Sequence, residues 1–149
     1  MGVFTFKRAF TALIGAVTLA FAFLFVSLSE DDFLLAGKAY EKSYYLYSAS
    51  SWAQEVAKVE LWELPFVEGK SVCLEFEKEN EAKAYAAALV KEKNAHLQKA
   101  EFSGEVESYY YYFSEGEECV RVSGLPVNLH IAVRGRFVSV GTPIIFGGY

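Results

Sequence analysis

The sequence predicts an α+β fold: one domain of an antiparallel sheet and two helices, preceded by a single N-terminal transmembrane helix. Three observations lead to this prediction. An uncharged apolar run occupies the N-terminus. Strand-favouring aromatic residues are abundant, with 10 Tyr and 13 Phe. Segments of helical periodicity and of alternating polarity follow the apolar run. We therefore divide the chain into an anchor, residues 1–29, and a folded domain, residues 30–149, of ordinary single-domain size.

The anchor prediction rests on residues 9–28, which carry no charge over 20 positions. As a helix this run would be about 30 Å long, the thickness of the hydrocarbon core of a bilayer. Lys7 and Arg8 precede the run, and Glu30, Asp31 and Asp32 follow it. Because positive flanks stay in the cytoplasm, we expect a single-pass protein of the cytoplasmic membrane with its C-terminal domain outside the cytoplasm.

A cleaved signal peptide is the competing interpretation of the same run. Ala20-Phe21-Ala22 fits a signal-peptidase site, and Ser27-Leu28-Ser29 is a weaker one. Cleavage at either site would release a secreted soluble factor. The apolar region of a signal peptide usually spans about 7–15 residues, and this run is longer. We therefore favour the uncleaved signal anchor.

The charge of the domain limits its partners. Residues 30–149 contain 12 Lys and Arg against 19 Asp and Glu, a net charge of −7. Nucleic-acid-binding proteins concentrate positive charge, so we expect no nucleic-acid partner. Electrostatic adhesion to an anionic membrane face is disfavoured for the same reason. The hydrophobic content of 53% also argues against a disordered tail.

The first half of the domain predicts one helix and two strands. Asp31 and Asp32 suit the first turn of a helix over 31–51, whose tyrosines recur at helical spacing. Residues 56–64 alternate imperfectly and end at Pro65, which predicts a strand. A turn at 66–70 then leads to a clean alternation over 71–77. The simplest pairing joins these two strands as a hairpin.

The second half predicts one helix and then only strands. Apolar residues recur at three- and four-residue steps over 79–100. Strands are expected over 105–113 and 119–123, with Gly124-Leu125-Pro126 interrupting the chain. Large apolar side chains at Val127, Leu129, Ile131 and Val133 then share one strand face, and a turn at Gly135 leads to a return strand over 137–145. Pro143 cannot donate a ladder hydrogen bond, so that strand should bulge, lie at an edge or end there.

Two stretches near the C-terminus resemble a known family. They are Asn128-Leu129-His130-Ile131-Ala132-Val133-Arg134 and Val140-Gly141-Thr142-Pro143-Ile144-Ile145, with a terminal Tyr149. Over about the last 45 residues the chain is similar to the YwmB-like proteins of Firmicutes, sometimes described as TATA-box-binding-protein-like in fold. The resemblance implies an extracytoplasmic domain with a curved antiparallel sheet and helices packed on one face. It implies no known activity.

The two cysteines are a candidate disulfide. Cys73 and Cys119 both fall on the polar side of their predicted strands, and outside the cytoplasm a disulfide is chemically permitted. The bond requires Cα atoms within roughly 7 Å and therefore neighbouring strands. Two separate thiols are the alternative. Two cysteines without a CxxC spacing do not predict a zinc site.

The polar side of the strand 127–133 is the other candidate site. Asn128, His130 and Arg134 alternate with the apolar residues, so we expect them to form a polar surface patch, with His130 less important for stability than Ile131. The remaining histidine, His96, follows Glu92 by one helical turn and is expected to be solvated. No residue set in the sequence predicts a metal site.

The function predicted by the sequence is therefore broad. We find no nucleophile motif, phosphate-binding loop or catalytic triad spacing, and expect no cofactor and no enzyme activity. The expected role is a binding or structural module of the cell envelope, held by the membrane through residues 9–28 and contacting an envelope protein. An envelope hydrolase that uses exposed carboxylates such as Glu75, Glu77, Glu117 and Glu118 is the alternative.

Overall fold

The computed structural model describes residues 11–20, 38–46, 54–60, 62–115 and 119–145. The chain divides into two compact units, residues 1–32 and 33–149. In the first unit, residues 11–20 form a helix, and every one of these ten residues is exposed. Within the described ranges, no helix is both long and apolar enough to cross a membrane.

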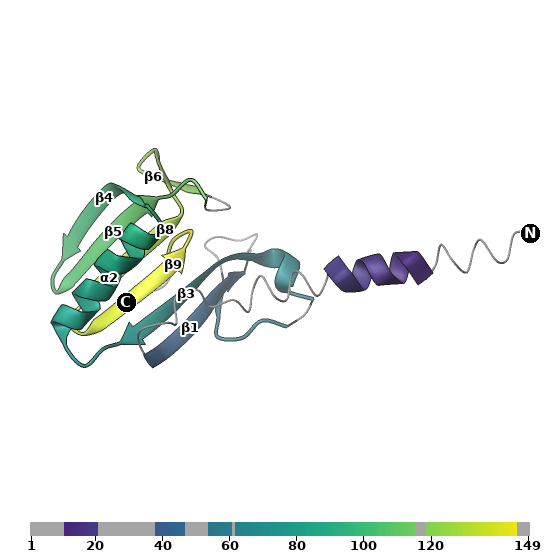
Figure 1. Ribbon diagram of the computed structural model, residues 1–149, viewed down its shortest axis with the longest axis horizontal. Coiled ribbons are helices and arrows are strands. Elements are labelled where there is room, and N and C mark those ends of the chain that lie inside the picture. Colours follow the sequence, from purple (N-terminus) through teal and green to yellow (C-terminus); the bar gives the residue numbers. More distant parts are fainter. Residues whose placement is uncertain (1–10, 21–37, 47–53, 61, 116–118, 146–149) are drawn as a thin grey trace, which may run out of the picture. The chain divides into compact units, whose positions relative to one another are not determined.

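The second unit is built on a seven-stranded antiparallel sheet with the strand order β2-β1-β3-β9-β8-β5-β4 (Figure 1). The strands of this sheet are β1 (Lys38–Leu46), β2 (Gln54–Val56), β3 (Val67–Glu75), β4 (His96–Ser103), β5 (Val106–Tyr112), β8 (Leu129–Arg134) and β9 (Phe137–Thr142). A short 3-10 helix, η1 (Leu64–Phe66), precedes β3. The predicted α+β class with an antiparallel sheet is therefore confirmed.

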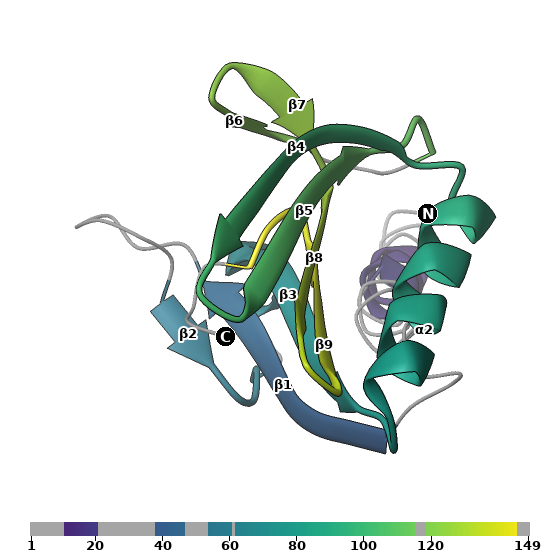
Figure 2. The same ribbon diagram turned by 90° about the vertical axis from the view of Figure 1, so that its left-hand side faces the viewer.

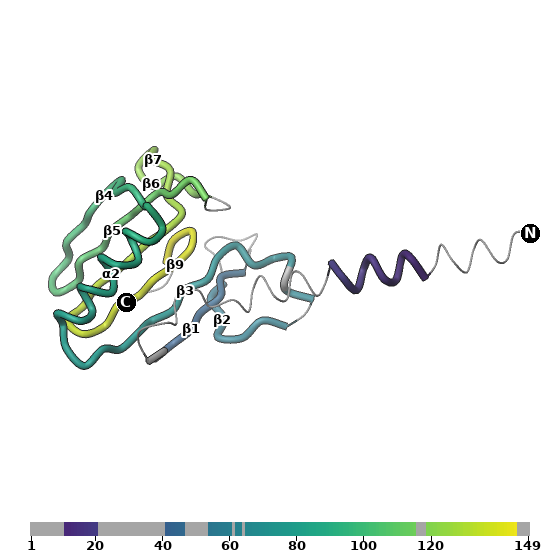
Figure 3. Tube along the Cα trace, viewed as in Figure 1, coloured from purple at the N-terminus to yellow at the C-terminus, as the bar shows by residue number. Residues whose placement is uncertain are grey.

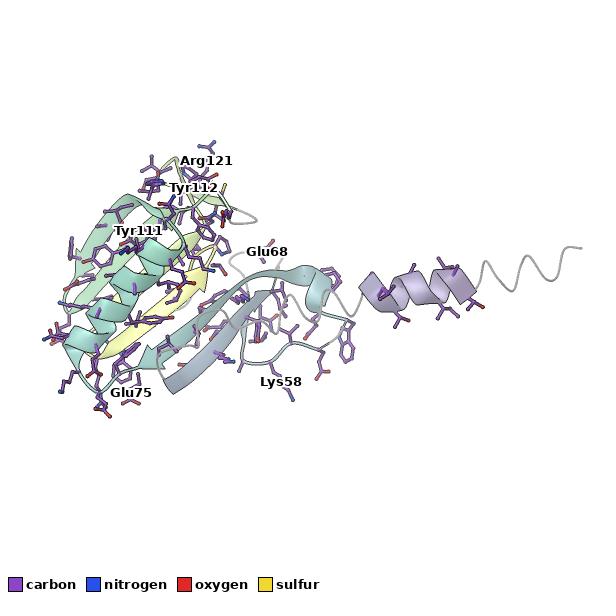
Figure 4. All side chains as sticks on the ribbon, viewed as in Figure 1. Lys58, Glu68, Glu75, Tyr111, Tyr112 and Arg121 are labelled. Carbon is purple, nitrogen blue, oxygen red and sulfur yellow. The ribbon has the colours of Figure 1, made fainter. Side chains whose placement is uncertain are left out.

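A separate two-stranded sheet consists of β6 (Val120–Val122) and β7 (Leu125–Val127). The sequence predicted an interruption at Gly124-Leu125-Pro126, whereas Leu125 already begins β7. Pro126 lies opposite Arg121 in this two-stranded ribbon, where a proline is tolerated because each strand is an edge strand. Arg121 extends outward from the hairpin, and its Nη1 donates to the Gly124 carbonyl (2.8 Å, Figure 4).

The core lies between the sheet and one helix, α2 (Glu79–Glu92), which runs beside the middle strands (Figure 2). Ala82 and Leu89 of α2 are buried, and Tyr85 packs on Phe76 with ring centroids 5.2 Å apart. The sheet contributes alternating apolar residues: Val72, Leu74, Leu129, Ile131, Val133, Val138 and Val140. Of the two helices predicted to pack on the sheet, the one that begins at residue 79 is present among the described residues as α2.

The end of α2 corrects the prediction of a helix over 79–100. The helix ends at Glu92, and Asn94 has a left-handed backbone (φ 47°), which stops helical propagation. Residues 96–103 form β4 and pair with β5. The pairing of β4 with β5 in a hairpin overrides the helical periodicity past Lys93, because tertiary context determines secondary structure more strongly than local pattern does.

The predicted helix over 31–51 is also wrong where the structure describes it. Lys38–Leu46 is strand β1, paired with β2 on one side and β3 on the other. Tyrosine favours strands, and the tyrosines spaced as a helical stripe suit an extended chain equally well. The other residues of this range lie outside the described ones.

The predicted hairpin of 56–64 with 71–77 does not form. Strand β2 ends at Val56, Leu64–Phe66 form η1, and residues 67–70 of the expected turn belong to β3. Strand β3 lies between β1 and β9, and its partner β9 comes from the C-terminal end of the chain (Figure 3). The alternation showed which residues of β3 face inward, but an alternating pattern does not specify the partner strand.

The C-terminal predictions are confirmed in part: Val127, predicted to share the strand of Leu129, Ile131 and Val133, instead ends β7 and pairs with Val120 of the small sheet. Strands β5 and β6 lie within the expected ranges, and β8 and β9 form the expected hairpin through Gly135, whose φ is +56°. Strand β9 ends at Thr142, directly before Pro143. A turn at Gly104 joins β4 to β5, and Gly104 also has positive φ (+60°).

Candidate functional site

The face of the sheet that points away from α2, here called the second face, carries the polar residues of the central strands. In β8, Leu129, Ile131 and Val133 belong to the core, so His130 and Ala132 point to the second face. The register aligns His130 with Gly141, and Gly141 with Ser71. The neighbouring row consists of Ser108, Ala132, Ser139 and Cys73. The middle of the second face is therefore lined by small side chains.

Residues 143–145 return across this face after β9 ends. The backbone N–H of Ile145 donates to Nδ1 of His130 (3.2 Å). A Cβ atom on Gly141 would lie 2.6 Å from Cγ1 of Ile145, and one on Gly69 would lie 2.7 Å from the carbonyl oxygen of Thr142. Both positions therefore require glycine, because a methyl group would displace this segment.

A chain of polar contacts runs from His130 to the edge of the sheet. The imidazole stacks on the ring of Tyr110, with centroids 4.2 Å apart and planes at 19°. The Tyr110 hydroxyl donates to Oε2 of Glu101 (2.9 Å). Glu101 pairs with Lys99 (2.6 Å), and Lys99 Nζ donates to Oγ of Ser123 (3.0 Å). These contacts join β8, β5 and β4 to the turn of the small sheet.

The electrostatics of this chain favour a neutral imidazole and an ionised carboxylate. Burial lowers the pKa of His130 to about 4, partly opposed by the negative charge of Glu101. Hydrogen bonds from Lys99 and then Tyr110 lower the pKa of Glu101. The neutral imidazole can accept the Ile145 N–H at Nδ1. Because His130 is only 1% exposed, the arrangement serves to hold strands and the returning segment together.

A second polar network lies on the face towards α2. Lys83 of α2 pairs with Glu79 (2.9 Å) and with Glu107 of β5 (3.1 Å). The hydroxyl of Tyr109 donates to Glu107 (2.8 Å). The hydrogen bond from Tyr109, followed by that from Lys83, lowers the pKa of Glu107. This exposed network links the helix to β5 at the rim of the core.

The structure does not bring Asn128, His130 and Arg134 together as the expected surface patch. Asn128 is 3% exposed and His130 is 1% exposed, whereas Arg134 is exposed at the end of β8. The Asn128 amide bridges the backbone of Phe113: Oδ1 accepts from its N–H (3.0 Å) and Nδ2 donates to its carbonyl (2.8 Å). Alternation places His130 on the face opposite the core, but neighbouring chain segments bury both His130 and Asn128.

The structure does not contain the candidate disulfide. Both thiols are free; Cys73 is half-buried in β3, and Cys119 is exposed just before β6. These strands belong to different sheets and are not neighbours, so the condition for pairing is not met.

The other candidates do not form a site in the part of the chain that the structure describes. His96 lies on strand β4 rather than on a helix with Glu92, and the described residues contain no cluster of His, Cys, Asp or Glu suited to a metal ion. Glu75 pairs with Arg136 (2.6 Å). Glu117 and Glu118 lie outside the described residues.

Sequence reasoning missed Tyr110, Glu101 and Lys99 as site residues. The predicted helix over 79–100 includes Lys99 and ends just before Glu101, so the two residues are not expected on one strand beside Tyr110. The available signal was the alternation of Lys99 and Glu101 around Ala100, which places both charges on one strand face.

In comparisons with known proteins, the chain matches no family model, no curated protein and no solved structure.

Proposed function

We propose that this protein is a single-pass membrane protein of the cell envelope whose extracytoplasmic domain, residues 30–149, acts as a binding or structural module. The observation that carries the proposal is the helix of residues 11–20. All ten residues are exposed and all except Thr11, Gly15 and Thr18 have apolar side chains, with Leu13 61% and Leu19 73% exposed. Such a surface is costly in water, at about 25 cal/mol per Å² of apolar area.

A bilayer would remove that cost. The helix lies inside the uncharged run of residues 9–28, whose length matches a membrane span. Lys7 and Arg8 on one side and three acids on the other support an N-terminus in the cytoplasm. The net charge of −7 on residues 30–149 is compatible with a domain that stands off an anionic membrane surface.

The proposed mode of action is binding. The polar groups of the second face are engaged in holding strands together, and His130 is enclosed by residues 143–145 rather than open to a substrate. Next to it, Ser139 of β9 and Cys73 of β3 are half-buried, whereas Ala132 of β8 is only 3% exposed. The part of the second face that a segment of an envelope protein would contact is therefore the surface around Ser139 and Cys73 rather than β8.

Kinship with the YwmB-like proteins is part of the proposal. The residues that carry the resemblance form β8, β9 and the returning segment 143–145. The close approaches at Gly141 give a physical reason why Gly141-Thr142-Pro143-Ile144-Ile145 would be retained as a unit.

Labelling of Cys119 tests the topology, because its thiol is exposed and free. A membrane-impermeant maleimide added to intact cells should label the full chain after mild reduction, and the protein should stay in the membrane pellet after alkaline extraction. Cys119→Ser is the control, since it leaves only the half-buried Cys73. Labelling that requires permeabilised cells would place the domain in the cytoplasm. Recovery of the protein from the medium would support the secreted alternative.

Photo-cross-linking tests the binding surface. A photoreactive amino acid at Ser139 on the second face should give a cross-linked partner, whereas the same group at Ala88, exposed on α2, should not. Equal yields from the two positions would argue against the second face as the binding surface.

A further inference from the structure

Strand β4 forms a long edge of the main sheet. In the described chain the sheet ends in β2 on one side and β4 on the other. β2 has three residues, whereas β4 has eight and contains no proline. An edge strand presents backbone N–H and C=O groups that can pair with another strand, and proteins usually blunt such edges. The shortness of β2 protects that edge, whereas β4 has a bulge between Leu97 and Lys99 and two charged residues, and its residues 99–103 pair with β5 in regular register.

The side of β4 that faces the α2 layer carries exposed apolar side chains. Phe102 is 71% exposed and Leu97 is 54% exposed. Helix α2 packs on β8 and β9, so it leaves the outermost strand of the sheet uncovered. Phe102 contacts only the edge of the Tyr109 ring among described aromatic neighbours, at 6.1 Å between centroids. These two side chains are therefore available to a partner that extends the sheet.

The charged residues of β4 are complementary to those of a second, antiparallel copy of the same strand. Lys99 and Glu101 flank Ala100 and share the second face. When the strand is paired antiparallel with its own copy about Ala100, Lys99 lies opposite Glu101 of the second copy, and Glu101 lies opposite Lys99. We propose that β4 pairs in this way with β4 of a second copy of this chain, forming a two-fold symmetric dimer.

The backbone hydrogen-bonding pattern of β4 agrees with a two-fold axis at Ala100. Gly104 and Glu105 form a two-residue loop between the partners Ser103 and Val106. Because hydrogen-bonded and non-hydrogen-bonded positions alternate from such a loop, Ala100 and Phe102 direct their backbone groups to the open edge. Ala100 can then form a hydrogen-bonded pair with its copy. The two Lys99–Glu101 pairs fall at the non-hydrogen-bonded positions, where side chains lie closest.

The resulting assembly joins both main sheets into one, with the two α2 helices on the same side. Phe102 and Leu97 of both copies then gather on that side of the junction. This places the apolar residues of β4 beside one another and removes its open edge from solvent.

Site-directed disulfide formation in the full chain tests the axis. In detergent micelles, with Cys73→Ser and Cys119→Ser as background, Ala100→Cys should form a covalent dimer under mild oxidation. Hydrogen-bonded antiparallel partners have Cα atoms about 5.5 Å apart, which is within disulfide range. Ala88→Cys, exposed on α2, is the matched control and should remain monomeric.

Charge exchange tests the interface without cysteine. Lys99→Glu and Glu101→Lys should each weaken dimerisation about tenfold, because each change turns two attractive cross-strand pairs into repulsive ones. The double variant should return to within about threefold of the original dissociation constant. Sedimentation equilibrium of the full chain measures these constants, and a cooperative melt checks that each variant folds.

Three results would overturn the proposal. A monomer at all concentrations would exclude the dimer, and equal cross-linking at positions 88 and 100 would exclude β4 as its interface. Cross-linking of Ala100→Cys only to a different protein would assign the edge to another partner.

Discussion

His130 illustrates how one buried side chain couples the fold to pH. Its ring lies between Tyr110 of β5 and the returning segment, and the nearby charge of Glu101 comes from β4. Burial disfavours the imidazolium form, so the folded chain accepts a proton on His130 less readily than the unfolded chain does. Because the pKa of His130 is lowered, the folded state is most stable when the imidazole is neutral.

The pH dependence follows from the sign of that shift. The pKa of His130 falls from 6.5 to about 4 on folding, so its contribution is complete above pH 6.5 and is lost as the pH falls towards 4. The loss is about 3 kcal/mol of unfolding free energy. Urea unfolding between pH 7 and 4 measures it, and His130→Gln should remove this component of the decline. His96→Gln, at an exposed position of β4, is the matched histidine control in the same titration.

Asn128 acts as a structural clamp between β7 and the end of β5. Asn128→Ala removes both side-chain hydrogen bonds to the backbone of Phe113. We expect the free energy of unfolding to fall by about 2–4 kcal/mol, because the half-buried N–H and C=O groups of Phe113 both lose their hydrogen-bond partner. Asn80→Ala, exposed in the first turn of α2, is the control and should change stability by less than about 0.5 kcal/mol. Chemical denaturation of both variants compares them, and similar midpoints would contradict the clamp.

At the scale of elements, α2 begins without a side-chain cap. Lys78 has the extended backbone of an N-cap residue (φ −135°, ψ 150°) but makes no capping hydrogen bond. Lys78→Ser would supply a hydroxyl to the first turn, with Glu81 at the reciprocal position of a capping box. The variant should gain about 1 kcal/mol of unfolding free energy. Thermal melts should show this gain, and Lys58→Ser in the exposed loop after β2 should show none (Figure 4).

Strand β8 is the central element of the core. Ile131→Ala should lose about 2–5 kcal/mol through lost apolar burial and a residual cavity. Arg134→Ala, at the exposed end of the same strand, should have little effect in the same urea titration. The sequence also predicted a mild effect for a change at His130. Its burial on the second face removes the reason for that expectation, since both faces of β8 are covered.

At the scale of the whole molecule, the chain separates into two units that should fold independently. The boundary lies at residues 32–33, close to the end of the uncharged run. A truncated protein of residues 30–149 should therefore be soluble and melt cooperatively, because the core between α2 and the sheet lies within it. Calorimetry checks the expectation. A broad melt without a clear transition would show that the first unit is required for folding.

The sequence by itself determined features whose signal is local. The uncharged run and its flanking charges define the division of the chain, and alternation with a turn glycine defines β5 and the β8–β9 hairpin. Pro143 ends β9 because it has no N–H to donate. In each case the deciding residues lie within a few positions of one another, so no distant contact was needed to identify the element.

Only the tertiary structure decided the features that depend on distant partners. Residues 38–46 and 96–103 match both helical and extended patterns, and pairing with β3 and with β5 selects the strand. The burial of His130 and Asn128 follows from Ile145 and Phe113, each 15 residues away in sequence. Alternating polarity specifies which side chains share a face, but which segment covers that face is set by long-range contacts, for which a local pattern carries no information.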